Sequence, residues 1–283
     1  MYIAFDIGGT NTRIAASKDG KEIFGEPKKI DTPKRFEDGL QMFEDVIREL
    51  IGDEKVEALG GGIGGPLSRD RTMLLSSNKE NLSGWVKKPL ATALSERIKA
   101  PVFLANDTAI VGLGEAYSGA GMGHDIVVYI TVSTGVGGAR IVHGKIDERV
   151  YGFEPGHQVI DIDNTLCKEC RSGELEDMVS GTATALRFGK PPYEVMDPKL
   201  WNEELPYWLA CGLRNTILHW SPNVLVLGGS MIIGNPAISV EATELQLREM
   251  LKLFPEPPVI KVAEHGAFGG IYGGLAYVRQ NLK

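Results

Sequence analysis

Short apolar runs alternate with amphipathic stretches along the 283 residues of this chain. The first run, Tyr2–Phe5, predicts a short buried strand that ends in a glycine turn, and Thr12–Ser17 predicts the strand after that turn. Val102–Leu104, Asp125–Val132 and Val224–Leu227 are further apolar runs that predict buried strands. Strands that alternate with helical stretches over the whole chain indicate an α/β fold.

The segment after residue 20 predicts one more strand and then a helix. Glu22–Glu26 predicts the strand, joined to the preceding one by a turn at Lys18–Gly20. Thr32 and Pro33 then match the N-cap and the first position of a helix. Apolar residues recur at helical spacing from Phe36 to Leu50, so this helix should pack one face against a sheet.

The glycine-rich stretches Gly61–Gly65 and Gly119–Gly123 invite comparison with nucleotide-binding fingerprints. Neither has the strand, the full glycine pattern and the ribose-binding acid of a dinucleotide site, so both are interpreted as turns or hinges. The chain also contains no GxxxxGK[ST] string, which excludes a P-loop enzyme.

The chain contains a weak internal repeat. A shift of 127 positions superposes three residues on identical ones, namely Gly8, Arg13 and Ile14 on Gly135, Arg140 and Ile141. Both segments have the pattern strand, glycine turn, strand, which presents backbone N–H groups at a hairpin tip. Two related lobes that face one nucleotide would each carry such a turn, so we expect a lobe boundary between Ala109 and Gly123.

Composition and charge narrow the class of protein. Thirty basic and 37 acidic side chains give a net charge of −7, which argues against a nucleic-acid partner because phosphate-backbone affinity needs clustered Lys and Arg. The three cysteines, Cys167, Cys170 and Cys211, are too few for a disulfide framework and suit a reducing compartment. Met1 leads directly into a strand and the apolar runs are short, so we expect a cytoplasmic protein without a membrane partner.

Asp6–Asn11 and Ser133–Gly138 are the candidates for phosphate binding. In the first string, two adjacent glycines let the backbone approach a ligand, and Thr10 and Asn11 add donors to a concave set of N–H groups. Asp6, at the end of a strand, can hold Mg²⁺ through water. A pair of glycines is equally typical of an ordinary hairpin turn, but the early position and the second, similar string favour phosphate binding.

Asn106 and Asp107 follow an apolar strand and precede a helical stretch. An aspartate in that position is also a good N-cap, and from the local pattern alone capping is the simpler interpretation. Phosphoryl transfer to an alcohol, however, needs one carboxylate beside the acceptor hydroxyl. We therefore expect Asp107 to activate the hydroxyl of the acceptor.

His157, Cys167 and Cys170 are candidate ligands of a zinc ion. Two thiolates and one imidazole need one more ligand to complete a tetrahedral site, and Glu169 and Glu174 lie nearby in the sequence. Two reduced cysteines in a surface loop are the alternative interpretation, and both interpretations stay open at this point.

Together these segments resemble the ROK family of sugar kinases, within the hexokinase–actin–Hsp70 superfamily, over nearly the whole chain. The resemblance rests on Asp6–Asn11 and Ser133–Gly138 (two phosphate loops), Leu104–Asp107 (catalytic segment), Glu154-x-Gly-His157 and Glu176 (sugar contacts), Val226–Gly229 (adenosine side) and Asn81–Trp85 (a further sugar-side segment). In that last segment, Asn78 competes with Asn81 for the sugar contact.

The resemblance implies an α/β, two-lobed actin-like fold, a duplicated ribonuclease H-like unit that closes on sugar and MgATP. The expected lobes are residues 1–115 and 116–283, with the last helix packing back on the first lobe. Asp107 is the expected base for the C6 hydroxyl. The expected sugar contacts are Asn81, Asn106, Glu154, His157 and Glu176. The expected ATP contacts are Asp6, Gly8, Gly9, Thr10, Asn11, Ser133, Thr134, Gly135, Gly137, Gly138, Gly228 and Gly229.

Two departures from the family pattern bear on these expectations. The family zinc motif is His followed by C-x-C-G-x-x-G-C-x-E, whereas Glu169 and Glu174 stand at its second and third cysteine positions here. Either Cys170 substitutes from a shifted position or the metal is absent, and without metal His157 needs another support, such as a hydrogen bond from its second ring nitrogen. The helix-turn-helix of repressor members is also missing, which disfavours a repressor.

The sequence therefore predicts an ATP-dependent hexose kinase of the glucokinase type, a homodimer that acts on a small sugar. An N-acetylhexosamine kinase or a fructokinase is the alternative within the family. A non-catalytic, sugar-sensing binding protein is the alternative from another class, but it would tolerate the loss of Asp107 or of one phosphate loop. Glu154 and His157 favour a glucose-like ring, with or without an N-acetyl group, over fructose.

Overall fold

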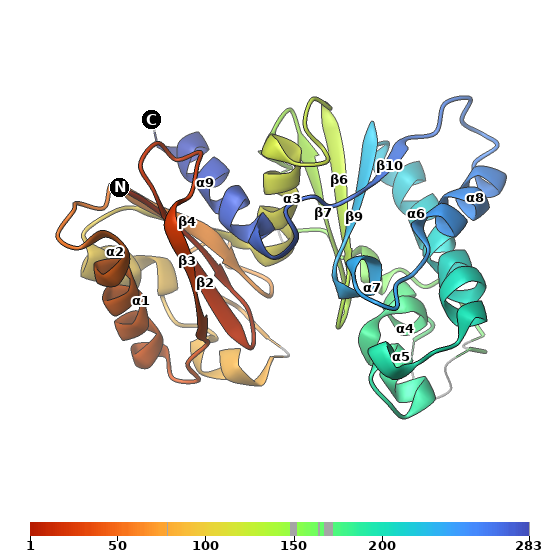
Figure 1. Ribbon diagram of the computed structural model, residues 1–283, viewed down its shortest axis with the longest axis horizontal. Coiled ribbons are helices and arrows are strands. Elements are labelled where there is room, and N and C mark those ends of the chain that lie inside the picture. Colours follow the sequence, from red (N-terminus) through yellow and green to blue (C-terminus); the bar gives the residue numbers. More distant parts are fainter. Residues whose placement is uncertain (78, 148–151, 164, 167–171, 283) are drawn as a thin grey trace. The chain divides into compact units, whose positions relative to one another are not determined.

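The computed structural model of the chain describes residues 1–283 except 78, 148–151, 164, 167–171 and 283. The chain forms two compact units (Figure 1). Unit 1 consists of Met1–Gly119, Lys145–Gly152 and Ala267–Lys283, and unit 2 consists of Ala120–Gly144 and Phe153–Gly266.

The sheet of unit 1 has the strand order β3-β2-β1-β4-β5. Its strands are β1 (Tyr2–Ile7), β2 (Asn11–Ser17), β3 (Phe24–Asp31), β4 (Ala58–Ile63) and β5 (Val102–Asn106). β1, β2 and β3 form an antiparallel meander, while β4 pairs in parallel with β1 and β5 in parallel with β4. The carboxyl ends of three parallel strands therefore lie at the same edge of this sheet, where β1 ends at Ile7 and β5 ends at Asn106.

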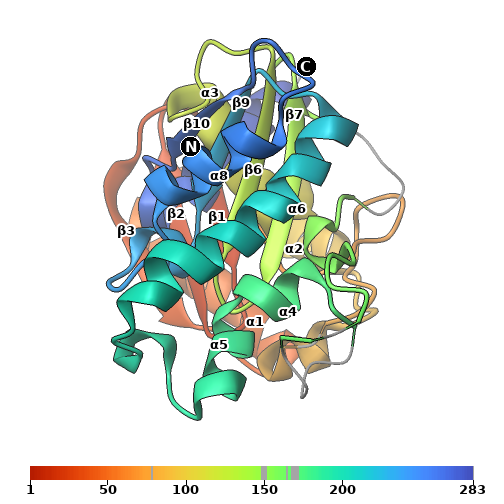
Figure 2. The same ribbon diagram turned by 90° about the vertical axis from the view of Figure 1, so that its right-hand side faces the viewer.

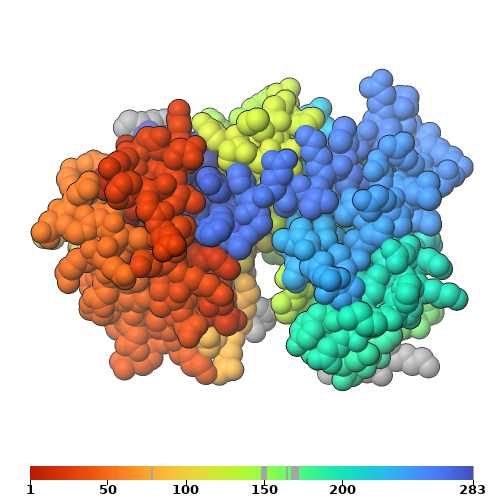
Figure 3. Space-filling view, in the orientation of Figure 1, coloured from red at the N-terminus to blue at the C-terminus, as the bar shows by residue number. Residues whose placement is uncertain are grey.

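Helices cover both faces of this first sheet. Ile3, Phe5 and Ile7 alternate along β1 and pack with α1 (Phe36–Ile51) and α2 (Leu90–Ile98). Ala4, which points to the opposite face, packs with Ile271 and Leu275 of the C-terminal helix α9 (Gly269–Asn281). The blue C-terminal segment consequently lies beside the red N-terminal strands (Figures 1 and 3).

Glycines bring α9 into close contact with α3 (Asp107–Ser118). A Cβ atom at Gly273 would overlap the carbonyl oxygen of Ile110, and one at Gly114 would lie 2.6 Å from the carbonyl oxygen of Gly269. Only glycine permits such an approach of two backbones. The contact fixes α3, and with it Asp107 at its first position, against the C-terminal helix.

The second sheet has the order β10-β9-β6-β7-β8, and all of its strands except β8 belong to unit 2. Its strands are β6 (Ile126–Val132), β7 (Val136–Val142), β8 (Lys145–Ile146), β9 (Val224–Gly228) and β10 (Val259–Val262). β6 pairs antiparallel with β7 and parallel with β9, and β10 is parallel to β9, as the corresponding strands do in unit 1. This shared topology confirms the duplicated, two-sheet α/β fold predicted from the sequence.

The internal repeat, by contrast, does not hold residue by residue. Residues 8–10 connect β1 to β2, and residues 133–135 connect β6 to β7. Gly8 is thus the first residue of the loop between β1 and β2, whereas Gly135 is the last residue of the loop between β6 and β7. The two hairpins are equivalent in topology but not at the shift of 127 positions.

Helices α4, α6 and α8 cover one face of the second sheet (Figure 2). Leu209, Leu213 and Ile217 on one side of α6 pack in the same core as Leu225 and Leu227 of β9. The helices of unit 2 are α4 (Leu175–Val179), α5 (Gly181–Phe188), α6 (Leu205–Trp220), α7 (Ser230–Ile233) and α8 (Val240–Met250). Shorter helical turns are η1 (Glu80–Trp85), η2 (Pro155–His157), η3 (Pro192–Glu194), η4 (Leu200–Glu204) and η5 (Gly266–Phe268). Within the described residues, no helix has both the length and the apolar character that crossing a bilayer requires.

The predictions for residues 22–36 were wrong at two boundaries. The third strand runs over Phe24–Asp31, not Glu22–Glu26, and α1 begins at Phe36 with Arg35 as N-cap. Thr32 caps no helix, because its buried hydroxyl donates to the carbonyl oxygen of Gly8 (2.8 Å) and lies 3.0 Å from the hydroxyl of Thr12. Thr32, which the sequence pattern predicts as a helix cap, therefore stabilises the first glycine turn instead.

The interpretation of Gly61–Gly65 as a turn was also wrong for its first residues. Gly60, Gly61 and Gly62 lie in β4, where all three are buried. A Cβ atom at Gly61 would overlap the carbonyl oxygen of Phe5, and one at Gly62 would lie 2.8 Å from the Cα atom of Asp107. Glycine is required here by close packing within a strand, which the local pattern does not distinguish from a turn.

Candidate active site

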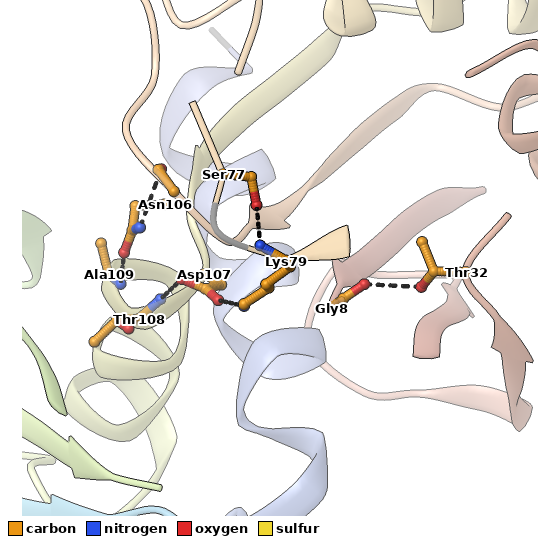
Figure 4. A network of polar contacts seen from close by, with 9 residues as sticks. Gly8, Thr32, Ser77, Lys79, Asn106, Asp107, Thr108 and Ala109 are labelled. Atoms are coloured by element: carbon orange, nitrogen blue, oxygen red, sulfur yellow. Dashed lines mark hydrogen bonds and ion pairs between the residues drawn. The ribbon is translucent and has the colours of Figure 1, made fainter. Parts of the chain in front are cut away.

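Asn106 and Asp107 lie at the junction where β5 ends and α3 begins (Figure 4). The Asn106 side chain accepts a hydrogen bond from the backbone N–H of Ala109 (3.2 Å) and donates to the carbonyl oxygen of Gly65 (3.3 Å). Asn106 is therefore the N-cap of α3, and the capping interpretation of Asp107 was wrong. Asp107 instead binds only the N–H of Thr108 through Oδ1 (2.8 Å), which leaves its Oδ2 to other partners.

The partner of that second oxygen is Lys79, a residue not singled out from the sequence. Its Nζ lies 3.3 Å from Oδ2 of Asp107 (Figure 4). The lysine side chain also crosses the first glycine turn, since a Cβ atom at Gly9 would lie 2.7 Å from its Cδ. A single lysine in an irregular loop carries no sequence signal, and only the fold brings it to this carboxylate.

Asp6 is a second carboxylate in unit 1, on the face of β1 that α9 covers. A Cβ atom at Gly270, near the start of α9, would lie 2.7 Å from its carboxyl carbon. Burial and, to a smaller extent, the negative charge of Asp107 raise the pKa of Asp6 to about 6, against the opposing effect of the positive charges of Arg13 and Lys79. A cation bound beside this buried carboxyl group would stabilise its charged form.

Replacing Asp6 with asparagine should raise the melting temperature of the ligand-free protein at pH 8. The folded pKa of about 6 exceeds the ordinary value of 3.8, so the folded state binds this proton more tightly than the unfolded chain. Wild-type stability therefore falls as the pH rises from about 4 to about 6, and the loss is complete above that window. Thermal unfolding of wild type and Asp6→Asn at pH 4 and pH 8 measures the change in melting temperature. An equally large difference between the two proteins at pH 4 would contradict the prediction. Asp53→Asn, which changes an exposed carboxylate, is the control.

The first glycine turn is held rigidly and leaves two amides free. The N–H of Gly8 donates to the carbonyl oxygen of Asn11 (3.0 Å), and Thr32 binds Gly8 on its other side. Within the described residues, the N–H groups of Gly9 and Thr10 donate to no protein acceptor. These two amides are the groups of the predicted loop that can bind an anion.

The second glycine string divides between a loop and a strand. Ser133, Thr134 and Gly135 form the loop, whereas Gly137 and Gly138 are paired in β7. The carbonyl oxygens of Ser133 and Thr134 accept hydrogen bonds from two successive amides at the start of α5 (2.7 and 3.2 Å). In the part of the chain that the structure describes, the amides of Thr134 and Gly135 have no protein acceptor.

A cavity of about 690 Å³ opens beside this second loop, entirely within unit 2. It is lined by Ser133 and Thr134, the start of α5, the segment 189–193, and Ser230 and Met231 of α7. Gly229, with φ of 91°, turns the chain from β9 into α7, and a Cβ atom there would lie 2.6 Å from Oγ1 of Thr131. Gly228 and Gly229 thus shape the wall that α7 forms, and the volume suits an organic ligand.

Three of the predicted sugar contacts belong to one network in unit 2. Nδ1 of His157 lies 2.7 Å from Oε2 of Glu174, the N-cap of α4. On the first turn of α4, Glu176 accepts a hydrogen bond from the N–H of Val136 (2.7 Å), directly after the second loop. The hydrogen bond to Glu174 raises the pKa of His157, partial burial lowers it, and the charges of Glu174, Glu176 and Glu154 raise it further.

The remaining sugar-side residue, Asn81, lies in η1 of unit 1. Trp85 at the end of η1 anchors this turn, because its indole N–H donates to the carbonyl oxygen of Pro33 (2.8 Å) and its ring packs edge-on against Phe36. Asn78, the competing candidate, lies outside the described residues.

The described residues alone do not make up a zinc site, because two of the predicted ligands are not among them. Cys167 and Cys170 lie outside them, and no group of three potential ligands occurs among the others. The Nδ1 atom of His157 already binds Glu174, at the position of the third cysteine in the zinc motif. Glu174 thus gives Nδ1 of His157 a hydrogen-bond partner on the protein.

Comparison with known proteins adds to this geometry. Residues 2–281 match the model of a single family, described as the ROK family. The chain belongs to the ROK family. A ROK hexokinase from Thermus thermophilus superposes with a TM-score of 0.80 at 28% identity, over 99% of this chain and 98% of that one. The two repeated sheets are accordingly those of the actin-like fold found in ROK proteins.

Two curated relatives of this chain are named as sugar kinases. A glucokinase from Thermotoga maritima is 35% identical over 217 residues, which cover 74% of this chain but only 64% of the glucokinase. An N-acetyl-D-glucosamine kinase from Escherichia coli O127:H6 is 27% identical over 304 residues, 96% of this chain and 97% of that enzyme. Sugar kinase is the class of enzyme that the comparisons support, and the two names differ in the sugar.

Proposed function

We propose that this chain is an ATP-dependent hexose kinase that transfers the γ-phosphoryl group to the C6 hydroxyl of a glucose-like sugar. The observation that carries the proposal is the position of Asp107. One of its oxygens accepts the N–H of Thr108, and the other lies 3.3 Å from Nζ of Lys79, whose side chain runs along a glycine turn with two amides that donate to no acceptor among the described residues. That is the arrangement needed for a base that receives the proton of an acceptor hydroxyl.

In the proposed reaction, the hydroxyl oxygen of the sugar forms a bond to the γ-phosphorus as the bond to the bridging oxygen of ADP breaks. The hydroxyl proton passes to Oδ2 of Asp107. Little covalent chemistry falls to the protein, so most of the acceleration comes from positioning and from neutralising charge.

The substrate MgATP is proposed to bind the two glycine loops. The free amides of Gly9, Thr10, Thr134 and Gly135 would bind phosphate oxygens, and Asp6 would hold the hydrated Mg²⁺ of the nucleotide. The cavity beside α5 and α7, which lies against the second loop, would receive the adenosine. Further residues proposed to contact the nucleotide are Gly8, Asn11, Ser133, Gly137, Gly138, Gly228 and Gly229.

The sugar is proposed to bind Asn81, Asn106, Glu154, His157 and Glu176. Carboxylate, amide and imidazole groups are the partners that ring hydroxyls require, because each hydroxyl both donates and accepts. Glucose and the N-acetylated hexoses differ at C2, so an N-acetylhexosamine kinase is the second candidate, favoured by the match over 97% of the Escherichia coli enzyme. We also propose a homodimer in the cytoplasm, where the half-buried thiol of Cys211 stays reduced.

A coupled assay of ADP release over glucose, mannose, N-acetylglucosamine, N-acetylmannosamine, fructose and allose tests the proposal. Glucose should give the highest kcat/KM, and 6-deoxyglucose should bind without being phosphorylated. The highest value with N-acetylglucosamine would favour the second candidate. Sugar binding without any sugar-dependent ADP release would instead identify a non-catalytic sugar sensor.

A further inference from the structure

We propose that Lys79 acts in the transfer step, where its ammonium group leaves Asp107 and binds the oxygens of the transferring phosphoryl group. This inference rests on the proposed kinase function. It assigns a role to a residue outside the phosphate loops and the sugar contacts discussed above.

The first argument is which oxygen of Asp107 the lysine occupies. Oδ1 accepts the N–H of Thr108, so Oδ2 is the oxygen that can accept the sugar proton. Lys79 lies 3.3 Å from this same Oδ2. An acceptor hydroxyl that reaches Oδ2 must therefore share it with the ammonium group or displace that group.

The second argument is the path of the lysine side chain across the first phosphate loop. Cβ atoms at Gly9 would lie 2.7 Å from Cδ and 2.9 Å from Cβ of Lys79. The amides of Gly9 and Thr10, adjacent to this path, are the free N–H groups of that loop within the described residues. A phosphoryl group that moves from these amides to a hydroxyl at Asp107 thus passes beside the Lys79 ammonium group.

The third argument concerns charge and unused hydrogen-bonding capacity. An ammonium group has three N–H donors, and among the described residues Asp107 is the one acceptor of the Lys79 ammonium group. Asp6 and Asp107 already interact as like charges, and a nucleotide adds further negative charge. A cation that can move between the base and the phosphoryl group neutralises charge where it develops in the transition state.

A purely structural ion pair is the alternative explanation. The Lys79 and Asp107 side chains are 40% and 26% exposed, and pairs with this exposure contribute little to stability. The lysine is also long and flexible, and it lies in an irregular segment between β4 and η1. Removing it should therefore change the reaction and leave the fold intact.

The test compares Lys79→Met, Lys79→Arg and wild type with the best sugar from the hexose panel. K79M should lower kcat by about 10²-fold with sugar KM within about threefold and an unchanged melting temperature. K79R, which keeps the charge, should retain more activity than K79M. Lys28→Met, which breaks an exposed ion pair with Glu49 in the same unit, is the matched control and should behave as wild type.

A double-mutant cycle separates an action on the phosphoryl group from an action through Asp107. If Lys79 binds the phosphoryl group, K79M should lower the residual rate of Asp107→Asn as well. A silent K79M in that background, or an unchanged kcat in the single variant, would overturn the inference but not the proposed kinase. A wild-type chain that phosphorylates no sugar would overturn both.

Discussion

Replacing Asp107 with asparagine should reduce phosphoryl transfer by about 10²–10⁴-fold, the usual contribution of a positioned base. The amide keeps the shape of the side chain and can still accept the N–H of Thr108 through its oxygen. It cannot take the proton of an acceptor hydroxyl. We therefore expect the loss in kcat, measured as sugar-dependent ADP release, with an unchanged dissociation constant for the sugar by titration calorimetry.

The control for this variant is Asp53→Asn, which removes an exposed carboxylate of the same unit. It should leave kcat and the melting temperature unchanged. Retained turnover in Asp107→Asn would show that another group receives the proton. Loss of sugar binding together with turnover would assign Asp107 to recognition of the sugar.

Replacing Glu174 with alanine should raise the KM for the sugar by about 10- to 100-fold, the range expected for a hydrogen bond to a charged group. The carboxylate binds Nδ1 of His157 and so fixes the ring, which leaves Nε2 for the proposed contact with the sugar. Steady-state kinetics over a range of sugar concentrations, at saturating MgATP, measure the change. Glu174→Gln keeps an uncharged acceptor and should show a smaller increase.

Glu174 is also the N-cap of α4, so the loss of a helix cap needs its own control. Ser239→Ala removes the N-cap of α8, where the hydroxyl accepts the N–H of Ala242 (3.1 Å), away from His157 in the sequence and in a different helix. This variant should lose some stability and keep the wild-type KM. One zinc ion per wild-type chain, together with an unchanged KM in Glu174→Ala, would show that metal supports His157 instead.

The strands and glycine turns of this fold could be predicted because their signals are local. Tyr2–Phe5, Asp125–Val132 and Val224–Leu227 are largely apolar runs, and strands cover all of their residues except Asp125. Thr32 and Gly61 were misassigned because tertiary contacts override their local patterns. The threonine hydroxyl serves a turn 24 residues earlier in the chain, and the glycine permits contact with Phe5.

The same distinction applies to the candidate site. Asp107 could be selected as a candidate because a carboxylate at a strand end near glycine turns is a recognisable pattern. Lys79 was not found, since nothing near it in the sequence marks a partner 28 residues away. Glu174 was noted as an available zinc ligand and as a departure from a cysteine motif, whereas its contact with His157 is seen only in the fold.

The order in which unit 1 is assembled has a consequence for synthesis. Its last helix, α9, follows all of unit 2 in the sequence, yet it covers β1 and holds α3 through the contact of Gly114 and Gly273. While the ribosome is still translating unit 2, the nascent unit 1 exposes the apolar face of its sheet around Ala4 and Ala15. Folding of this unit cannot finish domain by domain from the N-terminus, so Asp107, at the start of α3, is placed only when the final helix has emerged.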